Sequence, residues 1–157
     1  MRTWLLRDAE ATAALARAVV QAQPTAHAPR LIALHGELGA GKTSFVQAFL
    51  AACGVRAAVR SPTYTLVESY VGDAGQALVH ADLYRLAAAQ EFEELGLREE
   101  FRPGATWLVE WPERARDALP AADLELNLVI LAQGRRAEVA AGTPAGAEWL
   151  QAVAADP

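Results

Sequence analysis

The stretch Leu31–Thr43, which reads LIALHGELGAGKT, decides the fold of this 157-residue chain. Its first four residues are apolar and predict a buried β-strand. From Gly36 to Thr43 the sequence fits the phosphate-binding pattern GxxxxGK(S/T) at every fixed position. A helical pattern of apolar residues begins at Lys42. Strand, glycine-rich loop and helix in this order predict a phosphate-binding loop, or P-loop. The alternative is an ordinary glycine-rich turn between a strand and a helix.

The residue types of this loop suit a bound phosphate group. Glycine has no Cβ, so backbone N–H groups can approach phosphate oxygens, and a helix start adds unpaired donors and a positive dipole end. Lys42 would place its charge on the β- and γ-phosphates, and the Thr43 hydroxyl would bind Mg²⁺. Lys42 is also the only lysine among 14 basic residues. The nucleotide-binding residues predicted from the loop are Gly36, Glu37, Leu38, Gly39, Ala40, Gly41, Lys42, Thr43 and Ser44.

Outward from the loop, apolar periodicity and turn residues predict alternating strands and helices. The predicted strands span 3–6, 31–34, 59–70, 77–84, 105–111, 124–132 and 137–141. The predicted helices span 9–22 with Asp8 as N-cap, 42 to a C-cap at Gly54, 87–95, 98–101, 113–119 and 145–155. Turns at 72–75 and 133–134 predict two β-hairpins.

These elements predict a single α/β domain over residues 1–157. The expected architecture is a P-loop NTPase fold, a mixed β-sheet flanked by helices on both faces. The nucleotide is expected at the C-terminal end of the P-loop strand.

The charge and the amino-acid composition argue against several classes of protein. A net charge of −5 and a pI near 5.2 argue against a protein that coats nucleic acid through a general basic field. The single cysteine, Cys53, excludes an intramolecular disulfide and forms no zinc pattern with the three histidines. Charged residues interrupt the first 20 residues, so we expect neither a secretory signal nor a membrane span, and a cytoplasmic location.

Two carboxylates follow apolar strand sequences and are candidates for the chemistry of the site. Asp82 follows LVHA and Glu110 follows TWLV, so both are expected near the C-terminal ends of strands. A P-loop enzyme needs an acidic Mg²⁺ ligand at such a position beside the loop. The predicted metal ligands are therefore Thr43, Glu110 and Asp82, and the predicted catalytic residues are Lys42, Asp82 and Glu110. The alternative for each carboxylate is an ordinary residue at a strand end.

Other polar and aromatic residues allow two interpretations each. The stretch Ser61–Thr65 is either the start of a strand or a loop that senses the γ-phosphate. His80 is either packed within its strand or a base. Trp111 either caps the site or belongs to the core. The arginines at positions 85, 114 and 116 are interpreted as charged residues on the protein surface.

Taken together, these segments resemble one family, the small bacterial P-loop ATPases of tRNA threonylcarbamoyladenosine (t6A) biosynthesis, of the TsaE or YjeE type. The resemblance rests on GELGAGKTSF at 36–45, SPTYTLVESY at 61–70, HADLYRL at 80–86, ELGL at 94–97 and WLVEWPE at 107–113. It implies a cytoplasmic ATPase of weak intrinsic activity that binds ATP or ADP with Mg²⁺. The family acts with its TsaB and TsaD partners, so contact with tRNA is expected only through them.

The resemblance also assigns roles to single residues. Lys42 and Thr43 would bind phosphate and Mg²⁺. Glu110 looks like the Mg²⁺ carboxylate of the family, and Asp82 looks like its catalytic acid near the metal or the water.

Four more residues complete the set implied by the resemblance. Thr65 matches the switch-like loop, and Trp111 matches an aromatic residue beside the site. Thr12 and Arg136 fall where the family contacts the adenine.

Three other functions compete with an accessory ATPase. A small-molecule P-loop kinase would need arginines that clamp the transferred phosphoryl group, for which Arg114 and Arg116 are candidates. A GTPase is disfavoured because the base-reading motif NKxD is absent: the only asparagine, Asn127, is followed by Leu128. A nucleotide-sensing module without significant turnover remains the third option.

Overall fold

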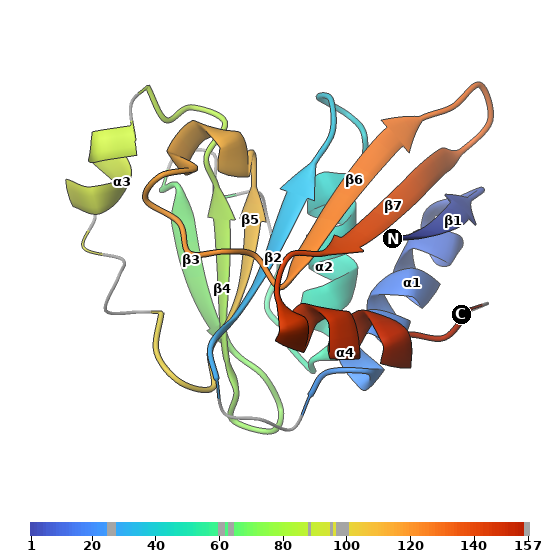
Figure 1. Ribbon diagram of the computed structural model, residues 1–157, viewed down its shortest axis with the longest axis horizontal. Coiled ribbons are helices and arrows are strands. Elements are labelled where there is room, and N and C mark those ends of the chain that lie inside the picture. The colour runs from blue at the N-terminus through green and yellow to red at the C-terminus, as the bar shows by residue number, and fades with distance from the viewer. Residues whose placement is uncertain are drawn as a thin grey trace.

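The computed structural model describes residues 1–24, 28–59, 62, 65–87, 89–94, 96 and 101–155. Within these residues the strands form one seven-stranded sheet in the order β1-β7-β6-β2-β5-β4-β3 (Figure 1). The strands are β1 (Arg2–Leu6), β2 (Arg30–His35), β3 (Val67–Val71), β4 (Ala77–Asp82), β5 (Thr106–Glu110), β6 (Leu124–Ile130) and β7 (Arg135–Ala141). The helices are α1 (Ala9–Gln21), α2 (Lys42–Ala52), α3 (Ala89–Glu94), the 3₁₀ helix η2 (Pro112–Ala115) and α4 (Pro144–Ala152).

The P-loop strand β2 lies in the middle of a parallel core. It pairs in parallel with β5 and β6, and β5 pairs in parallel with β4. The register places Leu34 opposite Glu110 and Glu110 opposite Asp82. Because parallel strands end at the same edge of a sheet, this register brings the C-terminal ends of three strands into one row. Antiparallel hairpins flank the core on both sides.

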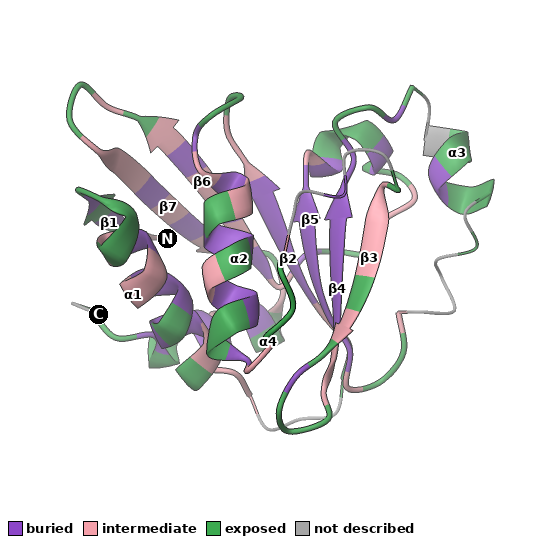
Figure 2. Cartoon of the chain, turned by 180° about the vertical axis from the view of Figure 1, so that it is seen from behind, coloured by how far each residue is buried: buried purple, intermediate pink, exposed green. Residues whose placement is uncertain are grey.

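Side chains of the sheet alternate between two apolar clusters, one on each face. Ile32 and Leu34 of β2 belong to the first cluster, whereas Leu31 and Ala33 belong to the second. Helices α1 and α2 cover the first face (Figure 2), and Trp149 of α4 also packs into that cluster. The second cluster is covered by η2, by Phe92 of α3 and by the chain around them. The predicted mixed sheet with helices on both faces is thus confirmed.

Several predicted boundaries are confirmed with small shifts. The Oδ1 atom of Asp8 caps α1 by accepting the Ala11 N–H at 2.8 Å, and α2 begins at Lys42 as predicted. The C-cap of α2 is Cys53, and the predicted cap Gly54 follows it with φ of 84°. Both predicted hairpins form. No helix of the described residues is long and apolar enough to cross a membrane. The single domain over 1–157 stays a prediction.

Other predicted boundaries are wrong in the chain after α2. The strand predicted over 59–70 begins only at Val67, because a turn precedes it: the Leu66 N–H donates to the Pro62 carbonyl at 2.7 Å, and Leu66 has φ of 62°. Ser61, Thr63 and Tyr64 of the predicted switch stretch lie outside the described residues.

Further along the chain the predicted elements are too long. The strand predicted over 105–111 ends at Glu110, since Trp111 adopts φ of 59° and redirects the chain. The helix predicted over 113–119 is the shorter η2. Helix α3 spans Ala89–Glu94 within the predicted 87–95, of which residues 88 and 95 lie outside the described residues. Of the helix predicted over 98–101, residues 98–100 lie outside the described residues, and Phe101 is in a bend.

Asp123 joins β2 to the start of α4. Its backbone N–H donates to the Leu31 carbonyl at 2.8 Å, and its Oδ2 accepts the Leu31 N–H at 3.1 Å. Its Oδ1 accepts the hydroxyl of Thr143, the residue that caps α4 by accepting the Gly146 N–H at 2.9 Å. The first turn of α4 therefore lies against backbone: a Cβ on Gly146 would be 1.8 Å from the Asp123 carbonyl oxygen.

Gly146→Ala should destabilise the protein by about 3 kcal/mol, the upper end of the usual cost of overpacking, because α4 must move off Asp123. The matched control is Gly75→Ala, where φ is 78° but the added Cβ has open space. That change should cost only about 1 kcal/mol from the left-handed conformation. Urea unfolding measures both free energies. Equal losses for the two variants would contradict the predicted contact at Gly146.

Candidate functional site

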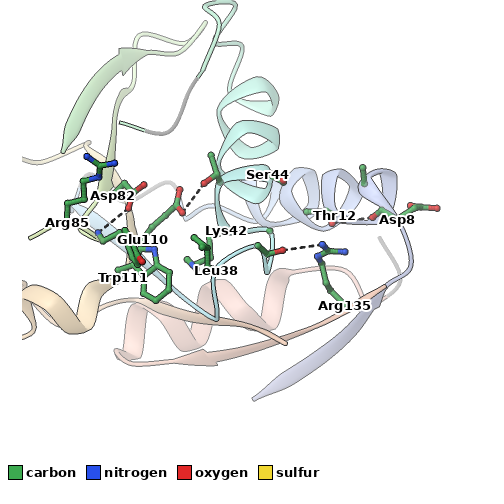
Figure 3. A pocket seen from close by; sticks show the side chains of 15 residues that line it. Asp8, Thr12, Leu38, Lys42, Ser44, Asp82, Arg85, Glu110, Trp111 and Arg135 are labelled. Carbon is green, nitrogen blue, oxygen red and sulfur yellow. Dashed lines mark hydrogen bonds between the residues drawn. The ribbon is translucent and has the colours of Figure 1, made fainter. Parts of the chain in front are cut away.

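A cavity of about 510 Å³ opens at the C-terminal ends of β2, β4 and β5, where α2 begins. Figure 3 shows Asp82, Arg85, Glu110 and Trp111 at one end of it and Asp8, Thr12 and Arg135 at the other, with Lys42 and Leu38 between them. The predicted site residues that line the cavity are Thr12, Leu38, Gly39, Gly41, Lys42, Thr43, Ser44, Asp82, Glu110 and Trp111.

The glycines give the P-loop its shape. Gly36, Gly39 and Gly41 have φ of 133°, 80° and 105°, in the left-handed range that residues with a Cβ rarely adopt. Gly36 also approaches backbone closely, since a Cβ there would lie 2.5 Å from the Leu128 carbonyl oxygen. Gly41 is the N-cap of α2 and brings no capping side chain. The first N–H groups of α2 therefore have no helical partner beside the cavity, which suits an anion.

Lys42 carries a buried positive charge between the loop and Trp111. Its Nζ donates to the carbonyl oxygens of Gly36 at 2.6 Å and Glu37 at 3.0 Å. The same atom lies 3.7 Å from the centroid of the Trp111 ring, a cation–π contact. Burial lowers the pKa of the Lys42 ammonium, while the nearby carboxylates of Glu110 and Asp82 oppose that shift. A fixed cation thus lies in the middle of the cavity.

Glu110 links the end of β5 to the start of α2. Its Oε2 accepts the Thr43 hydroxyl at 3.0 Å, and its Oε1 is 2.9 Å from Nε2 of His80. Only 2% of Glu110 is exposed. The predicted Mg²⁺ ligands Thr43 and Glu110 are therefore in direct contact.

Asp82 completes the predicted metal set on the next strand. It lies opposite Glu110 in the β4–β5 register, is 6% exposed, and its Oδ1 accepts the Tyr84 N–H at 3.2 Å. Hydroxyl and carboxylate oxygens are the ligands that Mg²⁺ prefers, and Mg²⁺ commonly uses one or two carboxylates together with substrate phosphates. No group of three or more His, Cys, Asp or Glu side chains within the described residues could hold a metal by itself. The residues present thus fit Mg²⁺ bound jointly with phosphate.

The arginine of β7 that contacts the P-loop is Arg135, the neighbour of Arg136, for which an adenine contact is predicted. Arg135 donates from Nε to the Ala40 carbonyl at 2.9 Å and from Nη2 to the Gly39 carbonyl at 3.2 Å. Strand alternation explains the choice. Ala137 of β7 packs in the first cluster, so Arg135 shares its face and Arg136 points to the other. The Nε of Arg136 donates to Glu138 at 2.8 Å instead. The role predicted for Arg136 stays a prediction, but it does not line this cavity.

Of the predicted nucleotide-binding residues Thr12 and Thr65, only Thr12 lies in the cavity wall. Thr12 of α1 lines the cavity, one helical turn after Asp8, whose carbonyl accepts its hydroxyl at 3.3 Å. Thr65 is exposed and is not part of the cavity wall. Gly36, Glu37 and Ala40 belong to the loop behind the wall, and Glu37 contributes its carbonyl to Lys42.

Four polar residues of the cavity wall are not among the predicted site residues, namely Asp8, Tyr84, Arg85 and Arg135. The sequence predicts Asp8 only as a helix cap and Arg85 only as a surface charge. The Tyr84 ring lies 5.0 Å from the Trp111 ring, centroid to centroid. Strand alternation identifies Arg135 only once Ala137 is known to pack in the first cluster.

His35 lies beside the site, directly before the P-loop, between two carboxylates. Its Nε2 is 2.5 Å from Glu125 of β6, and its Nδ1 is 3.6 Å from Glu113 of η2. The hydrogen bond to Glu125 raises the pKa of His35, with a smaller contribution from Glu113, against the effect of burial. The imidazole of His35 thus joins β2, β6 and η2.

The comparisons with known proteins agree on one family. Residues 6–137 match the model of the family described as threonylcarbamoyl adenosine biosynthesis protein TsaE. The chain is 40% identical over 122 residues to the tRNA threonylcarbamoyladenosine biosynthesis protein TsaE of Haemophilus influenzae, which covers 78% of this chain and 77% of the relative. It is 36% identical to the protein of the same name from Bacillus subtilis, over 69% of this chain and 73% of that one.

A solved structure is similar over nearly the whole chain. The crystal structure of YdiB from Bacillus subtilis superposes with a TM-score of 0.77 and 26% sequence identity, covering 96% of this chain and 92% of YdiB. The similarity confirms the predicted fold class.

His35 should make stability depend on pH. A raised pKa in the folded state means that the stabilisation is fully present below the unfolded pKa of about 6.5 and is lost as the pH rises through the folded value. Between pH 6 and pH 9 the parent should therefore lose more free energy of unfolding than His35→Gln does. Urea unfolding at both pH values measures this difference. Parallel pH dependences of parent and variant would contradict the charged contact.

Proposed function

Because this chain belongs to the TsaE family of threonylcarbamoyl adenosine biosynthesis proteins, we propose that it acts in tRNA t6A biosynthesis as an Mg²⁺-dependent ATPase. The names of its relatives support the role in t6A biosynthesis. One observation carries the proposed ATPase activity: a P-loop lysine, a Thr43–Glu110 contact and the Asp82 carboxylate line a single cavity. Together these groups supply what phosphoryl transfer to water requires, namely charge stabilisation and positioning.

Each residue has a distinct role in the proposed reaction. The uncapped start of α2 and the Lys42 ammonium bind the phosphates of ATP. The Thr43 hydroxyl and the Glu110 carboxylate would hold Mg²⁺, which would supply positive charge that offsets the charge of the phosphates. Asp82, beside Glu110, orients the attacking water and accepts its proton.

The shape of the cavity favours one orientation of the nucleotide. The carboxylates and Lys42 attract the metal and the phosphates to one end, so the adenosine extends toward Thr12 and Arg135 at the other (Figure 3). Arg135 holds the loop through the Ala40 and Gly39 carbonyls while its charge remains on the cavity wall.

We extend the proposal to the partners of the reaction. The ATPase would support t6A formation together with TsaB and TsaD and would contact tRNA only through them. The net charge of −5 supports indirect contact, because direct binding of tRNA depends on neutralising many phosphates.

A small-molecule kinase is a weaker candidate. The arginines expected to clamp a transferred phosphoryl group, Arg114 and Arg116, do not line the cavity. Arg116 lines a separate cavity together with His35 and Glu125.

Lys42→Ala should lower the partner-stimulated rate of ATP hydrolysis by about 100-fold or more, because the transition state loses its fixed positive charge. The assay measures phosphate release by the full chain, alone and with TsaB and TsaD. Arg56→Ala, which removes an exposed charge beyond the end of α2, should behave like the parent. Binding of ATP without any effect of the partners would overturn the accessory role, and phosphate transfer to a nucleoside or sugar would favour the kinase.

Arg135→Ala should weaken ATP binding about tenfold, equivalent to about 1.4 kcal/mol, because the loop loses its clamp and the cavity loses a positive charge. Arg136→Ala removes the same charge from the neighbouring residue and should change affinity little. Calorimetric titration with ATP compares the two. A larger loss for Arg136→Ala would support the adenine contact implied by the family resemblance and contradict the geometry.

A further inference from the structure

We propose that His80 is a positioning residue that fixes the Glu110 carboxylate for Mg²⁺ through the hydrogen bond between its Nε2 and the Oε1 of Glu110. The inference rests on the proposed function and deepens it. His80 does not line the cavity and its side chain is 0% exposed, so it does not touch a bound substrate. His80 is packed within its strand, as one of the two interpretations predicted, and it also contacts Glu110.

The two oxygens of Glu110 have different partners. Oε1 is 2.9 Å from Nε2 of His80, and Oε2 is 3.0 Å from the hydroxyl of Thr43. Contacts at both oxygens fix the rotation of the carboxylate. The oxygen that His80 occupies is directed into the protein, and the other faces the predicted metal ligand Thr43. His80 therefore selects which oxygen of Glu110 is presented to the metal ion.

The two ring nitrogens of His80 have different surroundings. Its Nδ1 is buried and has no hydrogen-bond partner in the described part of the chain. A proton on Nε2 donates to Glu110 and leaves a lone pair at Nδ1, which needs no acceptor there. Glu68, opposite His80 in the β3–β4 register, accepts the Tyr70 hydroxyl at 2.6 Å.

The imidazole donor has a chemical consequence for Glu110. A hydrogen bond from Nε2–H orients the carboxylate, whereas an arginine or lysine in its place would form an ion pair and compete with Mg²⁺. Asp82, two residues later on β4, projects from the same face of the strand. One strand thus supplies both the support behind Glu110 and the second carboxylate beside it.

Two amide variants test the hydrogen bond. In His80→Gln the side-chain amide nitrogen can take the place of Nε2, whereas in His80→Asn it reaches only the place of Nδ1. The stability control is Val79→Ala, which loses apolar contacts in the second cluster on the opposite face of the sheet. For each full-length protein, calorimetry measures ADP affinity across a Mg²⁺ titration and in EDTA, and electron paramagnetic resonance follows Mn²⁺ binding in the presence of ADP.

We expect His80→Asn to raise the Mg²⁺ concentration for half-maximal enhancement of ADP binding by roughly 10- to 100-fold, with ADP affinity in EDTA unchanged. His80→Gln should restore most of the metal dependence, and Val79→Ala should keep it. Mn²⁺ binding should follow the same order.

Several outcomes would overturn the inference. His80→Asn with the Mg²⁺ dependence of the parent would show that the hydrogen bond does not matter. Equal losses in His80→Gln and His80→Asn would assign the position to ring packing, and the same loss in Val79→Ala would assign it to stability. A parent protein that binds ADP equally well with Mg²⁺ and with EDTA would instead overturn the proposed metal site, and this inference with it.

Discussion

The shared register of β2, β5 and β4 is the constraint on which the site depends. Leu34, Glu110 and Asp82 are consecutive partners across three parallel strands, so the P-loop and the two carboxylates leave the sheet at the same level. A slip of one residue in β5 would turn Glu110 to the opposite face, away from Thr43. Tight apolar packing on both faces opposes such a slip, since the inner residues of β5 are buried on both sides. The core therefore stabilises the fold and aligns the site in one arrangement.

Four polar side chains of the site are buried in this core. Lys42, His80, Asp82 and Glu110 are all buried, and burial of a charge is costly unless hydrogen bonds compensate it. Each of them has a partner: the loop carbonyls for Lys42, Thr43 and His80 for Glu110, and the Tyr84 N–H for Asp82. Hydrogen bonds to backbone atoms and side chains therefore offset part of the cost of burying these groups.

The sequence predicts the parts of the molecule that depend on local pattern. The P-loop, the α2 start and the strand-end positions of Asp82 and Glu110 follow from residue type and spacing, and the structure brings these residues together. What escaped prediction depends on tertiary context. The run 59–70 has β-favouring composition, but a turn at Leu66 delays the strand. Arg135 and Arg136 are chemically identical neighbours, and only the inward packing of Ala137 decides which one meets the loop. The contact of His80 with Glu110 joins positions 30 residues apart, which no local pattern encodes.

The left-handed turn at Trp111 has an optical consequence. Its backbone N–H contacts the Leu34 carbonyl at 3.3 Å, and its ring lies over the Lys42 ammonium. The other three tryptophans, Trp4, Trp107 and Trp149, are enclosed in the two apolar clusters. Indole emission responds to nearby charge, so Trp111 reports on the ammonium directly while the other three provide a constant background. With those three replaced by phenylalanine, the protein would carry an intrinsic fluorophore within its own cavity, and the occupancy of the loop could be followed without a label.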